Sequence, residues 1–221
     1  MKLDSLIFDI DGTLWDSSET IAEAFSEASS LFPFGKREFS GERLRAEMGR
    51  PLNVIFRHLY PELDELFEKD IKQAERLLRR INSVSSEMEY EFLRKRGGKL
   101  YPGVRETLDS LSRRIPLFIV SNCEKGYIEI MLEATGMEPY FRGWLCYGDN
   151  NAEKDKNIRF IADKNGLKAP AYVGDIDKDA VSSEKAGVPF IWASYGFGSV
   201  SQGMYRERID DFRELEGIIE G

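Results

Sequence analysis

Residues 6–18 read LIFDIDGTLWDSS and set two carboxylates two positions apart, directly after an apolar run. Side chains at positions i and i+2 of a strand lie on the same face, so Asp9 and Asp11 can point into one site. Gly12 permits a sharp backbone turn behind them, and Thr13 supplies a hydroxyl that can fix the turn. Two aligned acids suit a reaction in which one attacks or binds a metal and the other moves a proton.

The rest of the chain predicts an α/β fold. Five short apolar runs, each bounded by Gly, Pro, Asn or Asp, have the composition of strands: LDSLIFD, PLFIVS, WLCY, AYVG and PFIWA. Helical patterns follow or separate them, in VRETLDSLSRR, YIEIMLEATG, NIRFIADKNG and DAVSSEKAG. Strands that are apolar on both faces fit a parallel sheet covered by helices on both sides. We therefore expect a Rossmann-like three-layer core with a parallel sheet of five main strands.

Residues 16–96 have a different texture, without a convincing strand. Apolar side chains recur at helical spacing, as in Ile21, Ala24, Phe25 and Ala28, and several Pro and Gly residues divide the segment. This predicts an all-helical cap domain in 16–96, inserted into a catalytic core made of 1–15 and 97–221. Its hinges are expected near Trp15–Asp16 and Gly97–Gly98.

Composition limits the partners and the location. The net charge is −8, from 31 basic and 39 acidic residues, which argues against nucleic-acid binding as the main role. No apolar stretch approaches the roughly 20 residues that span a bilayer, and Met1 leads directly into a predicted strand, so neither a membrane anchor nor a leader is expected. Cys123 and Cys146 lack C-x-x-C spacing and predict reduced thiols in the cytoplasm. A monomer or weak homodimer is expected.

Two further segments supply groups that suit a phosphate. Ser121 and Asn122 end the run IPLFIVSN, where a hydroxyl and an amide can bind the oxygens of a phosphoryl group, although an ordinary turn is the alternative. Lys154 precedes a helical run in NNAEKDKNIRF and offers a point positive charge. Lys156 competes for that role, and Lys154 is preferred.

The segment AYVGDIDKDA adds a second acidic group at a strand end. Asp175 follows Gly174, and Asp179 comes four residues later. Carboxylates facing another acid pair form a cluster of hard oxygens, which suits Mg²⁺ and would be strongly repulsive without a cation. Asp177, between them, is expected to serve a turn or to support its neighbours.

In this order, the four segments resemble the signatures of the haloacid dehalogenase superfamily. The first matches D-x-D-G-T and the last matches G-D-x-x-x-D, and all four lie at predicted strand ends, where open α/β sheets bind ligands. The resemblance covers the whole chain, including the helical segment after the first motif. It is strongest to the phosphoglycolate-phosphatase and β-phosphoglucomutase branch, in which a Gly-rich loop like that of PFIWASYGFG follows the last strand.

The resemblance implies a mechanism. Asp9 attacks the phosphorus of a phosphomonoester and forms an aspartyl-phosphate, while Asp11 protonates the leaving oxygen and then activates water. The implied phosphate ligands are Ser121, Asn122 and Lys154; the implied Mg²⁺ ligands are Asp9, Asp175 and Asp11 through its backbone carbonyl, with Asp179 supporting the metal or Lys154. Dehalogenases and phosphonatases of the superfamily lack the second acid, so Asp11 disfavours C–Cl and C–P cleavage.

The leading prediction is a Mg²⁺-dependent phosphatase that acts on a small phosphorylated metabolite. A phosphomutase of the β-phosphoglucomutase type is the first alternative, and a non-enzymatic binding protein on the same scaffold is the second. Arg50, in MGRPLN, is the candidate for substrate specificity, and a solvated arginine is the competing interpretation. For His58, the only histidine, a structural role is expected.

Overall fold

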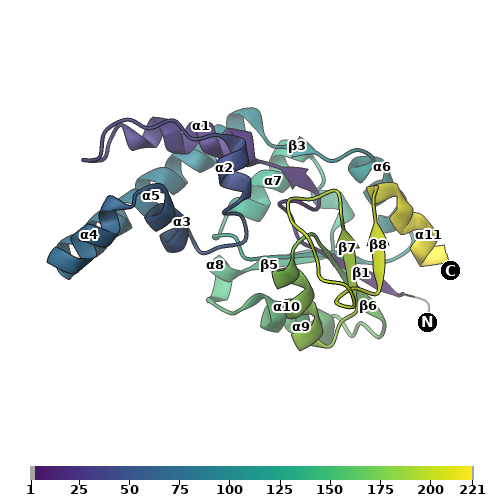
Figure 1. The fold of residues 1–221 in the computed structure, drawn as a ribbon. Coiled ribbons are helices and arrows are strands. Elements are labelled where there is room, and N and C mark those ends of the chain that lie inside the picture. The colour runs from purple at the N-terminus through teal and green to yellow at the C-terminus, as the bar shows by residue number, and fades with distance from the viewer. Residues whose placement is uncertain (1–2, 221) are drawn as a thin grey trace. The chain divides into compact units, whose positions relative to one another are not determined.

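The computed structural model describes residues 3–220, which form two compact units. One unit, here called the α/β unit, comprises the chain up to Asp16 and from Lys99 onward. The other, the helical unit, is Ser17–Gly98. Figure 1 follows the chain through both.

In the described part of the α/β unit, six parallel strands form one sheet in the order β5-β4-β1-β6-β7-β8. Their bounds are β1 Ser5–Phe8, β4 Leu117–Ser121, β5 Gly143–Cys146, β6 Pro170–Gly174, β7 Phe190–Ala193 and β8 Glu207–Ile209. The strand β1 lies inside the sheet, because Ile7 pairs with Phe118 of β4 on one side and Tyr172 of β6 on the other. The strand that precedes Asp9 is therefore flanked by the strands that precede Asn122 and Asp175.

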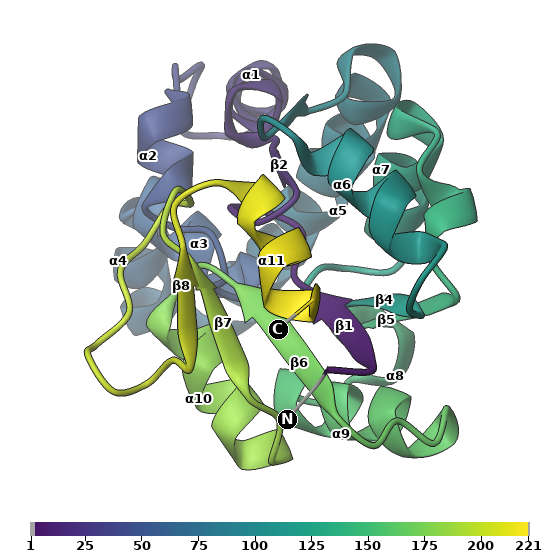
Figure 2. The same ribbon diagram turned by 90° about the vertical axis from the view of Figure 1, so that its right-hand side faces the viewer.

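Helices cover both faces of this sheet (Figure 2). The longer ones are α6 Val104–Ser112, α7 Tyr127–Thr135, α9 Lys154–Lys164 and α10 Asp177–Ala186; shorter ones are α8 Tyr147–Asn150, α11 Leu215–Glu220, η1 Glu138–Tyr140 and η2 Phe212–Glu214. On one face, α9 and α10 pack through Ile158 and Ala180 onto Ile7, Phe118 and Tyr172. On the other, Phe8 packs against Phe212 of η2, which contacts α6 and α11. The predicted three-layer α/β fold is confirmed.

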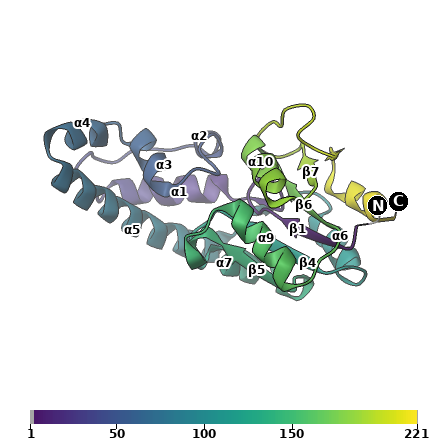
Figure 3. The same cartoon turned by 90° about the horizontal axis from the view of Figure 1, so that it is seen from below.

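The helical unit contains α1 Ser18–Ser29, α2 Gly41–Arg45, α3 Leu52–Leu59, α4 Glu62–Lys69 and α5 Ile71–Arg96. The long helix α5 packs against α1, α3 and α4, and Figure 3 shows α1 running beside it. An aromatic cluster of Phe25, Phe32, Phe56 and Tyr60 fills the space between the shorter helices and α1. The side chain of Asp70 accepts a hydrogen bond from the Gln73 amide and so begins α5.

Two strand pairings were not expected from the sequence. The five predicted strands are present, and β8 adds a sixth at the edge of the sheet. In addition, β2 (Trp15–Asp16) pairs antiparallel with β3 (Lys99–Leu100), at the point where the chain leaves and re-enters the α/β unit. In the portion of the chain that the structure describes, no helix combines the length and apolar composition needed to cross a bilayer.

Candidate active site

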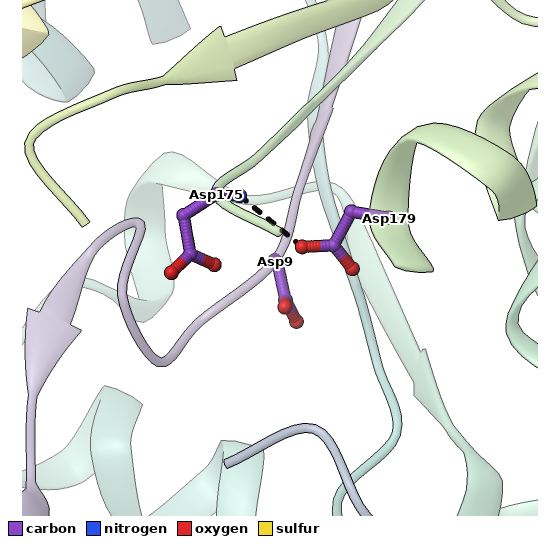
Figure 4. A group of neighbouring side chains, drawn as sticks. All are labelled: Asp9, Asp175 and Asp179. Atoms are coloured by element: carbon purple, nitrogen blue, oxygen red, sulfur yellow. Dashed lines mark hydrogen bonds between the residues drawn. The ribbon is translucent and has the colours of Figure 1, made fainter. Parts of the chain in front are cut away.

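Three carboxylates meet at the carboxyl ends of two neighbouring strands. Asp9 follows β1, Asp175 follows β6, and Asp179 lies in the first turn of α10. One carboxylate oxygen from each lies within 4.8 Å of the others, and all three side chains are buried (Figure 4). Because parallel strands end at the same edge of the sheet, motifs that are far apart in sequence converge here.

Asp179 fixes the geometry of this cluster. Its Oδ2 accepts hydrogen bonds from the backbone amides of Asp175, at 3.1 Å, and Ile176, at 3.3 Å. The first of these is the dashed line in Figure 4. Its Oδ1 accepts a hydrogen bond from Lys154 Nζ at 2.6 Å. Asp179 therefore ties the turn that carries Asp175 to the lysine.

Lys154 is the first residue of α9 and is only 3% exposed. Its Nζ lies 3.0 Å from Asp9 Oδ2, in addition to its contact with Asp179. Burial lowers the pKa of Lys154, but the negative charges of Asp179 and Asp9 outweigh that effect and hold the pKa well above its usual range. Lys156, on the same helix, is exposed. Of the two lysines, the structure brings Lys154 into the cluster.

The cluster carries more negative charge than Lys154 balances. Burial raises the pKa of Asp9, with Lys154 opposing and Asp179 adding to the effect. Burial also raises the pKa of Asp175 well above its usual range, and the charges of Asp179 and Asp9 raise it further. Asp9 Oδ1 is buried and has no hydrogen-bond partner among the described residues. A buried, unpartnered carboxylate oxygen beside two further carboxylates fits a hard divalent cation such as Mg²⁺.

Of the remaining predicted residues of the α/β unit, Ser121 contacts Asp9 directly. Ser121 ends β4, next to β1, and its hydroxyl hydrogen-bonds Asp9. Asn122 follows and is exposed. Asp11 is half-buried, two residues beyond Asp9, and its segment bridges to Trp15.

Sequence reasoning missed two groups that hold the predicted acids. The hydroxyl of Tyr127, at the start of α7, donates to Asp11 Oδ1 at 2.8 Å across 116 residues of sequence. The backbone amide of Phe197, in the loop after β7, donates to Asp175 Oδ2 at 2.8 Å. Nothing near Tyr127 in sequence indicates its contact with Asp11, since the fold alone brings the two residues together. The Gly-rich composition of the loop at 194–198 was the one signal for the second contact.

Gly12 and Gly196 allow the three segments to approach one another closely. Gly12 has φ +80°, and a Cβ on it would lie 2.0 Å from Asp175 Oδ2. A Cβ on Gly196 would lie 2.3 Å from the Gly12 carbonyl oxygen and 2.4 Å from Asp175 Cβ. The turn after Asp11, the end of β6 and the loop after β7 are therefore in contact at the backbone level.

Three other residues singled out in the sequence make contacts within their own unit. Arg50 belongs to the helical unit, where its Nε is 3.2 Å from Glu47 Oε2 and its side chain is half-exposed. His58 Nδ1 also contacts Glu47 Oε2, at 2.8 Å. Asp177 is exposed, and its carboxylate accepts a hydrogen bond from the Ser201 amide at 2.8 Å.

Residues 6–193 match the family model described as haloacid dehalogenase-like hydrolase. The match spans most of the chain, so the chain belongs to this family and is an enzyme of the hydrolase class. The resemblance seen in the motifs is thereby confirmed.

Named relatives narrow the comparison. The phosphoglycolate phosphatase of Pseudomonas syringae pv. tomato is 29% identical over 97% of this chain and 79% of its own length. The phosphoglycolate phosphatase of Rhodobacter capsulatus is 26% identical over 98% of this chain and 97% of its own. These relatives are phosphatases, as the motifs predict for this chain. In fold, the chain resembles the crystal structures of a putative phosphoglycolate phosphatase from Lactobacillus delbrueckii subsp. bulgaricus (TM-score 0.81, 21% identity, 99% of each chain) and a predicted one from Haemophilus somnus (TM-score 0.80, 22% identity, 99% and 98%).

Proposed function

We propose that this enzyme is a Mg²⁺-dependent phosphatase that hydrolyses a small phosphomonoester through an aspartyl-phosphate on Asp9. The observation that carries the proposal is the buried cluster of Asp9, Asp175, Asp179 and Lys154 at the carboxyl edge of the sheet. A buried anionic nucleophile beside a cation and further acids is the equipment that phosphoryl transfer requires, because that reaction depends mainly on positioning and charge neutralisation.

Each residue has a defined task in the proposed reaction. A carboxylate oxygen of Asp9 forms a bond to phosphorus as the ester P–O bond breaks, and Asp11 gives its proton to the departing alcohol oxygen. A water molecule then attacks the phosphorus, Asp11 takes the water's proton, and the bond between Asp9 and phosphorus breaks. Lys154 and the Ser121 hydroxyl, both in contact with Asp9, bind oxygens of the transferring group, and Asn122 contributes through its backbone.

The metal assignment follows from the charge balance. The carboxylates of Asp9 and Asp175 and the backbone carbonyl of Asp11 would hold Mg²⁺, and Asp179 would support them. When bound, the ion neutralises charge on the phosphate and the acids. The contact of Asp179 with Lys154 at 2.6 Å supports a second task for Asp179, which is to hold the lysine in place.

The substrate proposal rests on the relatives. Those named above are called phosphoglycolate phosphatases, so a small phosphorylated carboxylic acid is the first substrate to test. The hydrolase family favours transfer to water over the phosphomutase alternative, which would instead produce a sugar bisphosphate intermediate. The clustered acids and Lys154 disfavour a binding protein without activity. A cytoplasmic location and a monomer or weak homodimer stay predictions.

Substitution of the nucleophile tests this function. Asp9→Asn is nearly isosteric but removes the carboxylate nucleophile, so phosphate release from a panel of phosphorylated metabolites with Mg²⁺ should vanish while the circular dichroism spectrum is unchanged. Asp11→Asn should also be severely impaired. Asp177→Asn is the matched control, because Asp177 is exposed and its contact with Ser201 needs only an acceptor oxygen. Full turnover by Asp9→Asn, or turnover after complete chelation, would refute the proposal.

A further inference from the structure

Tyr127 has no assigned role in the reaction, yet its side chain reaches the proposed acid–base residue. It is the first residue of α7, directly after Gly126 with φ +95°, and its side chain is 3% exposed. Its phenol hydroxyl donates a hydrogen bond to Asp11 Oδ1 at 2.8 Å. A hydrogen bond to a charged acceptor is stronger and more directional than one between neutral groups, so this contact restricts the orientation of the Asp11 carboxyl group.

The surroundings of Tyr127 hold its ring in place. The ring packs edge-on against Trp15, with centroids 6.0 Å apart, and Trp15 is fully buried. Trp15 belongs to the same turn as Asp11, because its carbonyl accepts the Gly12 amide at 3.0 Å and its backbone bridges to Asp11. Tyr127 thus makes two independent contacts with the turn that carries Asp11: its hydroxyl binds Asp11, and its ring packs on Trp15.

We propose that Tyr127 is a positioning residue for Asp11. The phenol holds Oδ1, so that Oδ2 faces the oxygen that receives or gives up the proton. This inference rests on the proposed function and extends it to a residue outside the four motifs. Tyr127 itself exchanges no proton with the substrate.

The chemistry of the leaving group separates this role from a merely structural one. An alkoxide leaves only with a proton from Asp11, so an alkyl phosphomonoester is sensitive to the orientation of that group. The p-nitrophenolate ion is stable without a proton, so transfer of the phosphoryl group from p-nitrophenyl phosphate to Asp9 hardly depends on Asp11. Loss of the phenol hydroxyl should therefore slow the first reaction selectively.

The experiment compares Tyr127→Phe with the wild-type enzyme under single-turnover conditions, with enzyme in excess and Mg²⁺ present. Phosphoenzyme formation from an alkyl phosphomonoester should slow about ten- to hundredfold. Release of p-nitrophenol in the first turnover should change less than about twofold. KM for the alkyl ester, measured separately at steady state with substrate in excess, should also stay within about twofold. Phenylalanine keeps the ring on Trp15, and Tyr140→Phe, in the 3-10 helix η1 that follows α7, is the matched control for loss of a phenol hydroxyl.

A double-mutant comparison provides an independent measurement. If Tyr127 acts through Asp11, the double variant Asp11→Asn/Tyr127→Phe is no slower with the alkyl ester than Asp11→Asn alone. Equal slowing of both esters by Tyr127→Phe, or additive losses in the double variant, would assign Tyr127 to structure and overturn the inference while leaving the phosphatase intact. A wild-type enzyme that forms no phosphoenzyme would overturn the proposed function and this inference together.

Discussion

Lys154 is the residue on which the electrostatics of the site depend most, because it lies between two of the three buried carboxylates. Its Nζ contacts Asp9 at 3.0 Å and Asp179 at 2.6 Å, and its side chain is almost completely buried. Burial of an ammonium group is unfavourable unless it is paired, and the two acids supply that pairing. The lysine in turn keeps Asp9 usable as an anion, since it opposes the effect of burial on the Asp9 pKa.

Lys154→Met tests this role. We expect kcat/KM for phosphate release to fall about 10²- to 10³-fold, the usual effect of removing one group that stabilises charge in a transition state. Methionine keeps most of the side-chain volume, so loss of packing contributes little. Lys156→Met, two residues along the same helix and exposed, should change kcat/KM less than about threefold. Equal effects of the two substitutions would show that Lys154 is not the residue whose charge binds the phosphate.

Single residues of the site differ in how far the sequence predicts them. Asp9 and Asp175 could be predicted because each follows an apolar run typical of a buried strand. The same short segment therefore indicates both the strand and the position of the acid at its end. Lys154 could be preferred over Lys156 only through the family resemblance, in which a lysine lies three residues before the Asn-Ile that opens the helical run. Tyr127 could not be predicted, because its contact with Asp11 depends on where α7 begins in space, and local patterns carry no such information.

At the scale of elements, the site depends on close contact between three connections: the turn after β1, the end of β6 and the loop after β7. The amide of Phe197 binds Asp175, and the Trp192 indole donates to the Asp175 carbonyl at 3.2 Å. The strand β7 and the loop after it thus each contribute one hydrogen bond to Asp175. The absence of a side chain at Gly196 is what lets this loop approach.

Gly196→Ala should displace the loop, because the new Cβ would lie 2.3–2.7 Å from Gly12 and Asp175. We expect an unfolding free energy lower by about 1–3 kcal/mol, as in other overpacked sites, and kcat/KM lower by about 10²-fold from a misplaced Asp175. Gly143→Ala in β5 is the control, since nothing lies within 4 Å of its added Cβ. Chemical denaturation and phosphate release measure the two effects. Wild-type kinetics of Gly196→Ala would show that catalysis does not depend on the position of this loop.

The strands that could not be predicted from the sequence lack the apolar runs on which the prediction of the other strands depends. The strand β8 is Glu207-Arg208-Ile209, with two exposed charged residues, so it has no apolar run to reveal it. The ribbon of β2 and β3 has two residues in each strand, and its pairing joins positions more than eighty residues apart. The five buried strands were predictable, because burial on both faces forces continuous apolar runs.

At the scale of the whole molecule, the buried acids link stability to pH and to metal. The pKa of Asp9 and of Asp175 is raised from an ordinary value of 3.8, so the native state binds protons more tightly than the unfolded chain. Their contribution to stability is complete below that ordinary value and is lost as pH rises through the raised values. Mg²⁺ binds the deprotonated acids, so its stabilising effect should grow over the same interval.

We therefore expect a fixed Mg²⁺ concentration, about 100 times the Kd at pH 8, to raise Tm by roughly 5–10 °C near pH 8. The same concentration should raise Tm by much less near pH 5. Thermal unfolding at several pH values, with Mg²⁺ and with a chelator, measures the change in Tm that the metal causes. Titrating groups away from the metal affect both measurements equally, so their contribution largely cancels in the difference. Asp175→Asn should flatten the profile. A rise in Tm that is the same at both pH values would contradict the coupling.

The division into two units suggests how the molecule selects its substrate. The helical unit leaves the α/β unit immediately after the turn that carries Asp11, and the β2–β3 pairing brackets both connections. We propose that this unit acts as a cap that moves against the core and closes over bound substrate. Within it, buried Glu47 accepts contacts from Arg50, His58 and Arg43, which fixes these three side chains around one point. Such an arrangement can bind an anionic group of the substrate.

Arg50→Ala tests whether the cap sets specificity. A guanidinium whose Nε is held by Glu47 can still present its other nitrogens to an anion, and loss of such a charge-assisted contact is worth about 1.5–3 kcal/mol. We expect kcat/KM for the best metabolite to fall about 10- to 150-fold, mainly through KM, and kcat/KM for p-nitrophenyl phosphate to change little, because that ester offers no second anionic group. Arg57→Ala is the control, since Arg57 lies on α3 of the same unit and pairs with Asp64. Equal effects on both substrates, or none on either, would remove Arg50 from substrate recognition and leave it as a solvated partner of Glu47.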